Sequence, residues 1–412
     1  MVIPSRSGRT LLAAQLPGIC RELAGLGALP APAGGIPPAA MDHRAPPAPA
    51  GGGDPTGAHA RLSGQVPAAS LPAEVIVVDN GSSDGTAAWL AAEWPQVELD
   101  ISADPLSFAA AVNRGIARAR YSHVCLLNND MLIEPGFFAA LLHAFHAVSG
   151  LFCATAQIRF PAGARREETG KAVMAQAHPD DFPIRCDEPI PGEDLSYVLY
   201  GSGGCSLYDA AMLHTLGGVD EAYAPAYVED LDLGYRAWQR GWPTVFVAGA
   251  VVEHRHRATT SRFFSDAQLA SILELNYLKF LARAVAHSPL FRKLWRQALD
   301  RLRRRNDATL RYAPALAFSA GPAGQPLCPE EEFLALTGGD VAVFPGRNGS
   351  QKPLVTLADR LETPAETVLA AHCEVVLVRR RSDARGDDRR GDSLALRAAE
   401  RWTAAKWAPR QR

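Results

Sequence analysis

The alternation of strand and helix patterns from Glu74 onward is the feature that most constrains the fold. Strand-like stretches are EVIVVDN, VELDIS, HVCLLNND and FCATAQIRF. Helix-like stretches stand between them: the segment after Thr86, SFAAAVNRGIARAR, and PGFFAALLHAFHAV with Pro135 near its first turn. Strands that alternate with helices predict an α/β fold with a mostly parallel central sheet. In such sheets ligands bind beyond the carboxyl ends of the strands.

The N-terminal segment adds a strand and a helix to this pattern. VIPS is a short strand candidate, and RTLLAAQLPGICRELAGL places Leu12, Leu16, Ile19 and Leu23 on one side of a helix. Residues 26–72 are rich in Ala, Pro and Gly and almost lack aliphatic periodicity. A segment of this composition cannot bury enough apolar surface to offset its ordering entropy, so we predict a dispensable, disordered insertion.

Bulk composition excludes several classes of protein. The chain has 412 residues, is 47% hydrophobic and carries a net charge of -2, so it has no basic excess for a nucleic-acid partner. Seven scattered cysteines without a C-x-x-C pair indicate reduced thiols, with no disulfide framework or zinc site. There is no signal-peptide core and no apolar run of the roughly 18 residues that span a membrane. We expect a cytoplasmic protein.

Acidic residues follow two of the predicted strands, and two more polar stretches lie further along. Asp79 ends the strand in EVIVVDNGSSDGT, and Asp130 ends HVCLLNND. Later come YVEDLDLGYR, which contains Glu229, Asp230 and Asp232, and then VVEHRH. Each stretch alone has an ordinary structural explanation: a turn, a helix cap, or an ion pair from Asp232 to the arginine four residues on. Their order on one α/β chain favours a ligand site.

Two other nucleotide-binding classes lack their motifs. A dinucleotide-binding dehydrogenase needs G-x-G-x-x-G after its first strand, whereas IPSRSGRTLL has a single glycine there. The phosphate-binding loop G-x-x-x-x-G-K-[ST] is also absent from the sequence.

Taken together, VIVVDNGSSDGT, LLNND, GGVDE, YVEDLDLGYR and the V-x-x-H in VVEH resemble the family 2 glycosyltransferases with the GT-A fold, and most closely their bacterial rhamnosyltransferase-like branch. The resemblance covers residues 1–25 and 73 to about 265. It implies transfer of a sugar from a nucleotide diphosphate sugar to an acceptor hydroxyl, with inversion at the anomeric carbon.

The resemblance also implies a nucleotide site and a metal site. The nucleotide-binding residues would be Pro4, Asp79, Asn80, Ser82, Asp84, Asn128 and Asn129. Asn128 stands where the family's Asp-x-Asp motif has its first acid, and Ser7 stands where the family often has Asn. Asp130 keeps the metal-binding position, and His254 matches a late histidine that would be a further ligand, with His256 as an alternative. Mn²⁺ or Mg²⁺ would then stabilise the departing diphosphate.

The same resemblance makes Asp230 the general base that accepts the proton of the acceptor hydroxyl. Glu229 and Asp232 would orient the acceptor or the base, and we expect the helix N-terminus to help keep Asp230 ionised. The small-residue loop GSGGCSL, residues 201–207, would lie near the donor sugar. An alternative function is a non-catalytic protein that binds sugar nucleotides on a decayed transferase fold.

Uridine, thymidine and guanosine donors all fit these motifs, and the rhamnosyltransferase resemblance favours deoxythymidine among them. The resemblance also implies a surface polysaccharide or a lipid-linked saccharide as the usual acceptor. A lipid-linked acceptor agrees with SPLFRKLWRQALDRLRRR, residues 288–305, a helix with one apolar face and one basic face. Its apolar face either packs on the protein or lies in the inner face of the cell membrane as a peripheral contact.

The sequence divides into five parts. We predict a glycosyltransferase domain at 1–25 and 73–265, the insertion at 26–72, a helical basic segment at 266–306, a small appended region at 307–380 and a charged tail at 381–412. In the appended region, ALAFSAG, DVAVFPG and EVVLVRRR are short strand candidates.

Overall fold

The computed structural model describes residues 1–26, 71–161, 171–174, 178–189, 193–255, 263–317, 326–337, 341–345, 365–370 and 373–379. Most of the predicted insertion, His256 and the charged tail lie outside these ranges.

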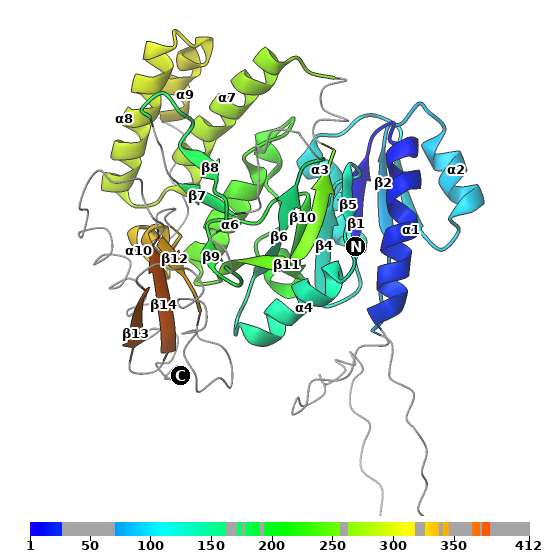
Figure 1. Ribbon diagram of the computed structural model, residues 1–412. Helices are drawn as coiled ribbons and strands as arrows, with labels where there is room; N and C mark the ends of the chain where they lie inside the picture. Colours follow the sequence, from blue (N-terminus) through cyan, green and yellow to red (C-terminus); the bar gives the residue numbers. More distant parts are fainter. Residues whose placement is uncertain are drawn as a thin grey trace, which may run out of the picture.

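A nine-stranded mixed sheet forms the centre of the molecule, with the order β3-β2-β1-β4-β10-β6-β11-β5 and with β9 paired to β11 (Figure 1). β3, β2, β1, β4, β6 and β11 run in one direction, and β10, β5 and β9 run in the other. The predicted α/β fold with a mostly parallel sheet is therefore confirmed. The strands are β1 (Val2–Ser5), β2 (Ile76–Asn80), β3 (Glu98–Ser102), β4 (His123–Leu127), β5 (Met131–Ile133), β6 (Cys153–Arg159), β9 (Tyr197–Val198), β10 (Cys205–Asp209) and β11 (Thr244–His254).

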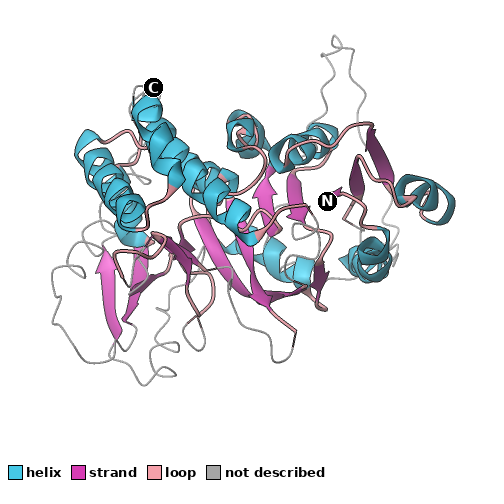
Figure 2. Cartoon of the chain, turned by 90° about the horizontal axis from the view of Figure 1, so that it is seen from above, coloured by secondary structure: helices cyan, strands magenta, loops and turns pink. Residues whose placement is uncertain are grey.

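Helices cover both faces of this sheet, as the view from above also shows (Figure 2). α1 and α4 pack on one face and α3 packs on the other, against β1 and β2. Successive residues of β1 serve the two faces: Ile3 lies in the cluster of α1, and Val2 in that of α3. The helices are α1 (Arg9–Gly25), α2 (Thr86–Glu93), α3 (Phe108–Arg118), α4 (Phe137–Ala147), α5 (Ala210–Thr215), α6 (Glu229–Gln239), α7 (Asp266–Ala284), α8 (Ser288–Arg304), α9 (Ala313–Ala317) and α10 (Glu330–Leu336), with the 3₁₀ turns η2 (Glu221–Tyr223) and η4 (Ala308–Tyr312).

The periodic patterns located the helices well and their ends less well. Leu12, Leu16 and Ile19 of α1 are fully buried, as their spacing predicts. α4 begins at Phe137, two residues after Pro135, because Gly136 adopts a left-handed conformation (φ 86°) and breaks the turn. Pro135 therefore precedes the helix instead of lying in its first turn.

The basic amphipathic helix α8 packs beside α7 at one end of the molecule (Figure 1). Leu290, Leu294, Ala298 and Leu302 are buried, so the apolar face of α8 is occupied by the protein. In the described part of the chain, no helix is both long enough and apolar enough to cross a bilayer.

The C-terminal part contains a second, three-stranded sheet in the order β12-β14-β13. β12 (Val341–Val343) and β14 (Cys373–Arg379) confirm the strands predicted in DVAVFPG and EVVLVRRR, and β13 is Ala365–Ala370. The strand prediction in ALAFSAG is wrong for residues 315–317, which complete helix α9, where alanine favours helix; residues 318–321 lie outside the described residues. A further small hairpin pairs β7 (Ala172–Met174) with β8 (Ile184–Cys186). The five predicted parts of the chain stay a prediction.

Candidate active site

The carboxyl ends of β1, β2 and β4 meet at one edge of the sheet and carry the polar residues predicted there. Ser5 of β1 lies opposite Asp79 of β2, and the segment Asn128–Asp130 follows β4. Asp79 and Asp130 are 2% and 7% exposed, so both carboxylates are largely withdrawn from solvent. The parallel pairing of β1 with both neighbours is what brings them to the same edge.

The turns after β1 and β2 are joined by hydrogen bonds. Asp79 Oδ1 accepts from the backbone N–H of Ser82 (3.3 Å), and Ser82 Oγ accepts from the N–H of Ser7 (2.8 Å). Ser7 itself has a left-handed φ of 48°. Pro4, which was predicted to bind the nucleotide, pairs with Val78 directly beside these turns.

Two predicted nucleotide-binding side chains already have partners within the protein. Asn80 bonds both backbone groups of Leu106, donating to the carbonyl at 3.1 Å and accepting from the N–H. Asp84 accepts from the N–H of Arg9 (3.1 Å) and from Thr86, so it links the starts of α1 and α2. Partial burial of Asp84 opposes ionisation, but the hydrogen bonds from Thr86 and Arg9 outweigh it and lower the pKa of this carboxyl. Their nucleotide contacts stay a prediction.

Gln15 holds the Asn128–Asp130 turn, and the sequence analysis missed it. Its Nε2 donates to the carbonyls of Asn128 and Met131, each at 2.6 Å. Asn129 Nδ2 donates to Ser5 Oγ (2.9 Å), which ties the turn to β1. Gln15 is only 2% exposed. The sequence feature that could have identified it is a polar residue on the buried, apolar side of α1.

Asp130 and His254 are neighbours because β11 pairs with β5. His254 lies opposite Met131 in that antiparallel pair, and its Nε2 is 3.6 Å from Asp130 Oδ1. A carboxylate and an imidazole are both ligands that a divalent transition metal accepts. Within the described ranges, no group of three His, Cys, Asp or Glu side chains gathers; His256, the alternative ligand, lies outside them.

The loop 201–204 connects this turn to the acidic start of α6. The carbonyl of Gly204 accepts from the N–H of Asn128 (2.9 Å), and the N–H of Gly203 donates to Asp230 Oδ2 (3.3 Å). An added Cβ at Gly204 would lie 2.5 Å from Asn128 Nδ2, so a larger residue there would force the Asn128 side chain to move. The backbone of Gly203 and Gly204 thus links the Asn128–Asp130 turn to Asp230.

The first turn of α6 presents Glu229 and Asp230 in a buried setting. Asp230 is half-buried and accepts from the N–H groups of Gly203 and Leu231, the latter at 2.8 Å. Burial raises the pKa of Asp230, and the hydrogen bonds from the N–H groups of Gly203 and Leu231 oppose this rise. The expected help of the helix N-terminus in keeping Asp230 ionised stays a prediction. Burial, with the adjacent Asp230 adding to it, raises the pKa of Glu229 well above its ordinary value. Glu229 Oε2 is buried and has no hydrogen-bond partner among the described residues.

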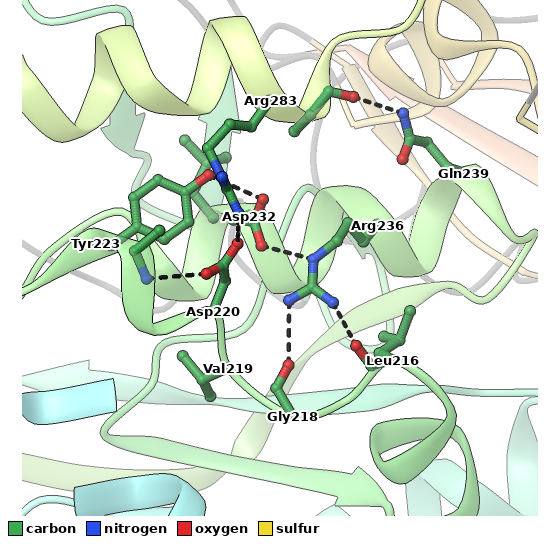
Figure 3. A network of polar contacts seen from close by, with 12 residues as sticks. Leu216, Gly218, Val219, Asp220, Tyr223, Asp232, Arg236, Gln239 and Arg283 are labelled. Atoms are coloured by element: carbon green, nitrogen blue, oxygen red, sulfur yellow. Dashed lines mark hydrogen bonds and ion pairs between the residues drawn. The ribbon is translucent and has the colours of Figure 1, made fainter. Parts of the chain in front are cut away.

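Asp232 belongs to a network with Tyr223 and Arg236 (Figure 3). It accepts from Arg236 Nε (2.6 Å) and from the Tyr223 hydroxyl (3.0 Å), so the predicted ion pair four residues on is confirmed. Arg236 also donates to the carbonyls of Leu216 and Gly218. Asp232 therefore fixes the loop before α6, and its orienting role toward acceptor or base stays a prediction.

Comparison with known proteins finds similar glycosyltransferases. An N-acetylglucosaminyl-diphospho-decaprenol L-rhamnosyltransferase of Mycobacterium tuberculosis is 29% identical over 219 residues, which are 47% of this chain and 70% of the relative. A Pyrobaculum calidifontis mannosyltransferase solved with GDP-Man and Mn²⁺ is 14% identical (TM-score 0.41; 76% of this chain, 72% of that chain). S. aureus TarS 1–349 with UDP-GlcNAc is 12% identical (TM-score 0.43; 82% and 89%). Structural similarity at this level says nothing about individual site residues.

A family model gives the assignment. The model described as "Glycosyltransferase like family 2" matches residues 62–270, just over half of the 412 residues, and this range includes β2, the Asn128–Asp130 turn, the start of α6 and His254. The resemblance noted in the sequence is confirmed, and the chain belongs to glycosyltransferase-like family 2.

Proposed function

We propose that this protein transfers a sugar, with inversion, from a nucleotide diphosphate sugar to an acceptor hydroxyl. The observation that carries the proposal is the loop 203–204, whose Gly204 carbonyl accepts from the N–H of Asn128 and whose Gly203 N–H donates to the Asp230 carboxylate. A donor whose diphosphate lay at the Asn128–Asp130 turn would have the anomeric carbon of its sugar beside the Asp230 carboxylate. In a direct displacement, the acceptor hydroxyl attacks the anomeric carbon from the face opposite the departing diphosphate, which inverts the configuration. This attack needs one base near the acceptor hydroxyl.

Donor binding would use the shared edge of β1, β2 and β4. Asp79 would accept a hydrogen bond from the base or ribose, Ser82 and Pro4 would complete the wall of the nucleoside site, and Asn128 and Asn129 would serve the ribose and diphosphate. A divalent cation, Mn²⁺ or Mg²⁺, held by Asp130 and His254 would supply Lewis-acid stabilisation of the departing diphosphate.

Asp230 would take the proton from the acceptor hydroxyl. At the same time the acceptor oxygen would bond to the anomeric carbon, and the bond from that carbon to the diphosphate would break. Burial raises the pKa of Asp230 and so makes it a stronger base than an exposed aspartate. The N–H groups of Gly203 and Leu231 orient the carboxylate.

A lipid-linked acceptor is supported by the relative that has a decaprenol-linked acceptor in its name. A lipid-linked acceptor would bring the protein to a membrane surface, and a rhamnosyl donor would carry deoxythymidine diphosphate. Since the apolar face of α8 is packed, a peripheral contact would use its exposed side chains Arg292, Lys293 and Arg296.

A donor panel tests the proposal. Deoxythymidine, uridine and guanosine diphosphate sugars are incubated with the protein, Mn²⁺ and a lipid-linked acceptor, and released nucleoside diphosphate is measured. We expect release from one donor, loss of release in excess chelator and recovery with Mn²⁺ or Mg²⁺. Binding of a nucleoside diphosphate without release from any donor would favour the non-catalytic alternative, and full activity in chelator would refute the metal.

A further inference from the structure

The turn that leads into α6 has an unusual backbone. Tyr227 and Val228 are consecutive non-glycine residues with left-handed φ values of 74° and 79°. Valine is β-branched and rarely adopts this conformation. A strained backbone of this kind persists only where surrounding contacts stabilise it, so we expect strong contacts to this turn.

Those contacts come from α7, most of which lies beyond the family match that ends at residue 270. Asn276 is 1% exposed, and its Nδ2 lies 2.7, 2.9 and 3.0 Å from the carbonyl oxygens of Tyr223, Ala226 and Tyr227. Lys279, one turn on, donates to the carbonyl of Ala222 (2.9 Å) and to Asn276 Oδ1 (3.0 Å). One amide therefore gathers three carbonyls of the turn, and a lysine holds that amide in place.

A second network, around Asp232 and Asp220, also holds the segment before α6 (Figure 3). The Tyr223 hydroxyl donates to Asp232 at 3.0 Å, and Arg283 of α7 pairs with Asp220 at 2.5 Å. Neither contact reaches the carbonyls of Ala226 and Tyr227, which immediately precede the left-handed Val228. Asn276 is the side chain that bonds to them.

Among the described residues, no other side chain forms a hydrogen bond with Asp230. Its hydrogen bonds come from the backbone N–H groups of Gly203 and Leu231, so its position depends on where the first turn of α6 begins. Val228 caps that turn, two residues before Asp230. We propose that Asn276, supported by Lys279, is a positioning residue that fixes the start of α6 and thereby aims Asp230. The catalytic consequence rests on the proposed function.

Asn276→Ala and the milder Lys279→Met test this assignment. Hydrogen exchange of the backbone amides of residues 222–232 is measured first, because it needs no substrate. We expect at least about tenfold faster exchange in Asn276→Ala than in wild type, and a smaller increase in Lys279→Met. With the donor found active, kcat should fall on the order of 10- to 100-fold in Asn276→Ala, as for a misplaced catalytic group. The Kd for the nucleoside diphosphate should change less than about threefold, since the hydrogen bonds of Asn276 go to the turn before α6 and not to the edge formed by β1, β2 and β4.

Glu274→Gln is the matched control on the same helix. Glu274 is buried and pairs with Arg301 of α8 and with Arg305, which follows that helix, so this variant weakens α7 packing without touching the turn. It should lower Tm while exchange at 222–232 and kcat stay at wild-type values.

Two results would overturn the assignment: unchanged exchange at 222–232 in Asn276→Ala, or a loss of kcat no larger than in Glu274→Gln. If Asn276→Ala does not fold, Lys279→Met decides by the same two measurements. A wild type that turns over no donor would refute the proposed function, and the exchange result would still decide whether Asn276 fixes the start of α6.

Discussion

Gly203 separates the ring of Phe108 from Asp230. An added Cβ at this position would lie 3.5 Å from Phe108 Cε1 and 3.6 Å from Asp230 Cβ, which is ordinary van der Waals contact. The protein can therefore accept alanine at 203, but the methyl group would project between the ring and the base. This is where the proposed mechanism needs room for the reacting sugar.

We predict that Gly203→Ala folds like wild type and loses roughly 10- to 100-fold in turnover, a loss typical of displaced reacting groups. Gly18→Ala is the control, because an added Cβ there meets nothing within 4 Å. It should keep full turnover and gain up to about 1 kcal/mol of stability from helix propensity. Steady-state kinetics and thermal unfolding of both variants measure the difference. Wild-type turnover in Gly203→Ala would show that the sugar lies elsewhere.

The buried Glu229 predicts a dependence of stability on pH. Its pKa is raised in the folded state, so its contribution to stability is fully present below the unfolded pKa of about 4.3 and is lost as pH rises through the folded value. Each unit of elevation corresponds to about 1.4 kcal/mol. Glutamine has no proton to lose, so Glu229→Gln should gain stability over wild type between pH 5 and pH 8.

Urea unfolding at pH 5 and pH 8 checks this prediction. The difference in unfolding free energy between Glu229→Gln and wild type should be larger at pH 8. Glu93→Gln, at an exposed position, is the control and should show no such trend. A difference that is equal at both pH values would mean that Glu229 titrates as an ordinary glutamate.

At the scale of elements, the site is built by three segments that were predicted and one contact that was not. The sequence located β2, β4 and the start of α6, because a buried strand before an acidic turn and an acidic first helical turn are local patterns. It did not predict that α1 would hold the Asn128–Asp130 turn through Gln15, a contact between residues 113 and 116 positions apart. Long-range hydrogen bonds of this kind leave no periodic signal.

We predict that Gln15→Leu weakens both stability and metal response. Two buried carbonyls, of Asn128 and Met131, would lose their Gln15 donor, at a cost of roughly 1–3 kcal/mol. The Mn²⁺ concentration for half-maximal turnover should rise, because Asp130 sits within this turn. Gln239→Leu is the control, since Gln239 also donates to two acceptors, on Ala284 and Glu330. If both variants need the same Mn²⁺ concentration, Gln15 supports the fold alone.

At the scale of the whole molecule, the α/β class with its mostly parallel sheet was predictable, and the packing of the C-terminal part was not. Alternating strands and helices indicated the α/β class, but the sequence treated residues beyond 306 as an appended region. The structure instead packs Phe333 of α10 against Tyr235 and Trp238 of α6, and Glu330 accepts from Gln239. Aromatic contacts between elements about a hundred residues apart follow from the fold and cannot be derived from spacing.

The exposed basic side of α8 predicts salt-dependent attachment to anionic vesicles. Arg292, Lys293 and Arg296 are exposed, and each cation near an anionic surface contributes about 1 kcal/mol. Co-sedimentation with anionic vesicles should be strong at low salt, weak at high salt, absent with neutral lipid and reduced in a triple glutamine variant. Recovery in the supernatant under every condition would reject the contact.

The most direct test of the central claim is the Asp230→Asn variant, assayed for both donor turnover and donor binding. Asparagine keeps the size of the side chain and cannot take the proton of the acceptor hydroxyl. The account predicts a loss of roughly 10²- to 10⁴-fold in kcat, the range for a general base, with the Kd of the nucleoside diphosphate nearly unchanged. Retained turnover together with a collapse of donor binding would contradict it, because Asp230 would then be a binding residue and the base would lie elsewhere.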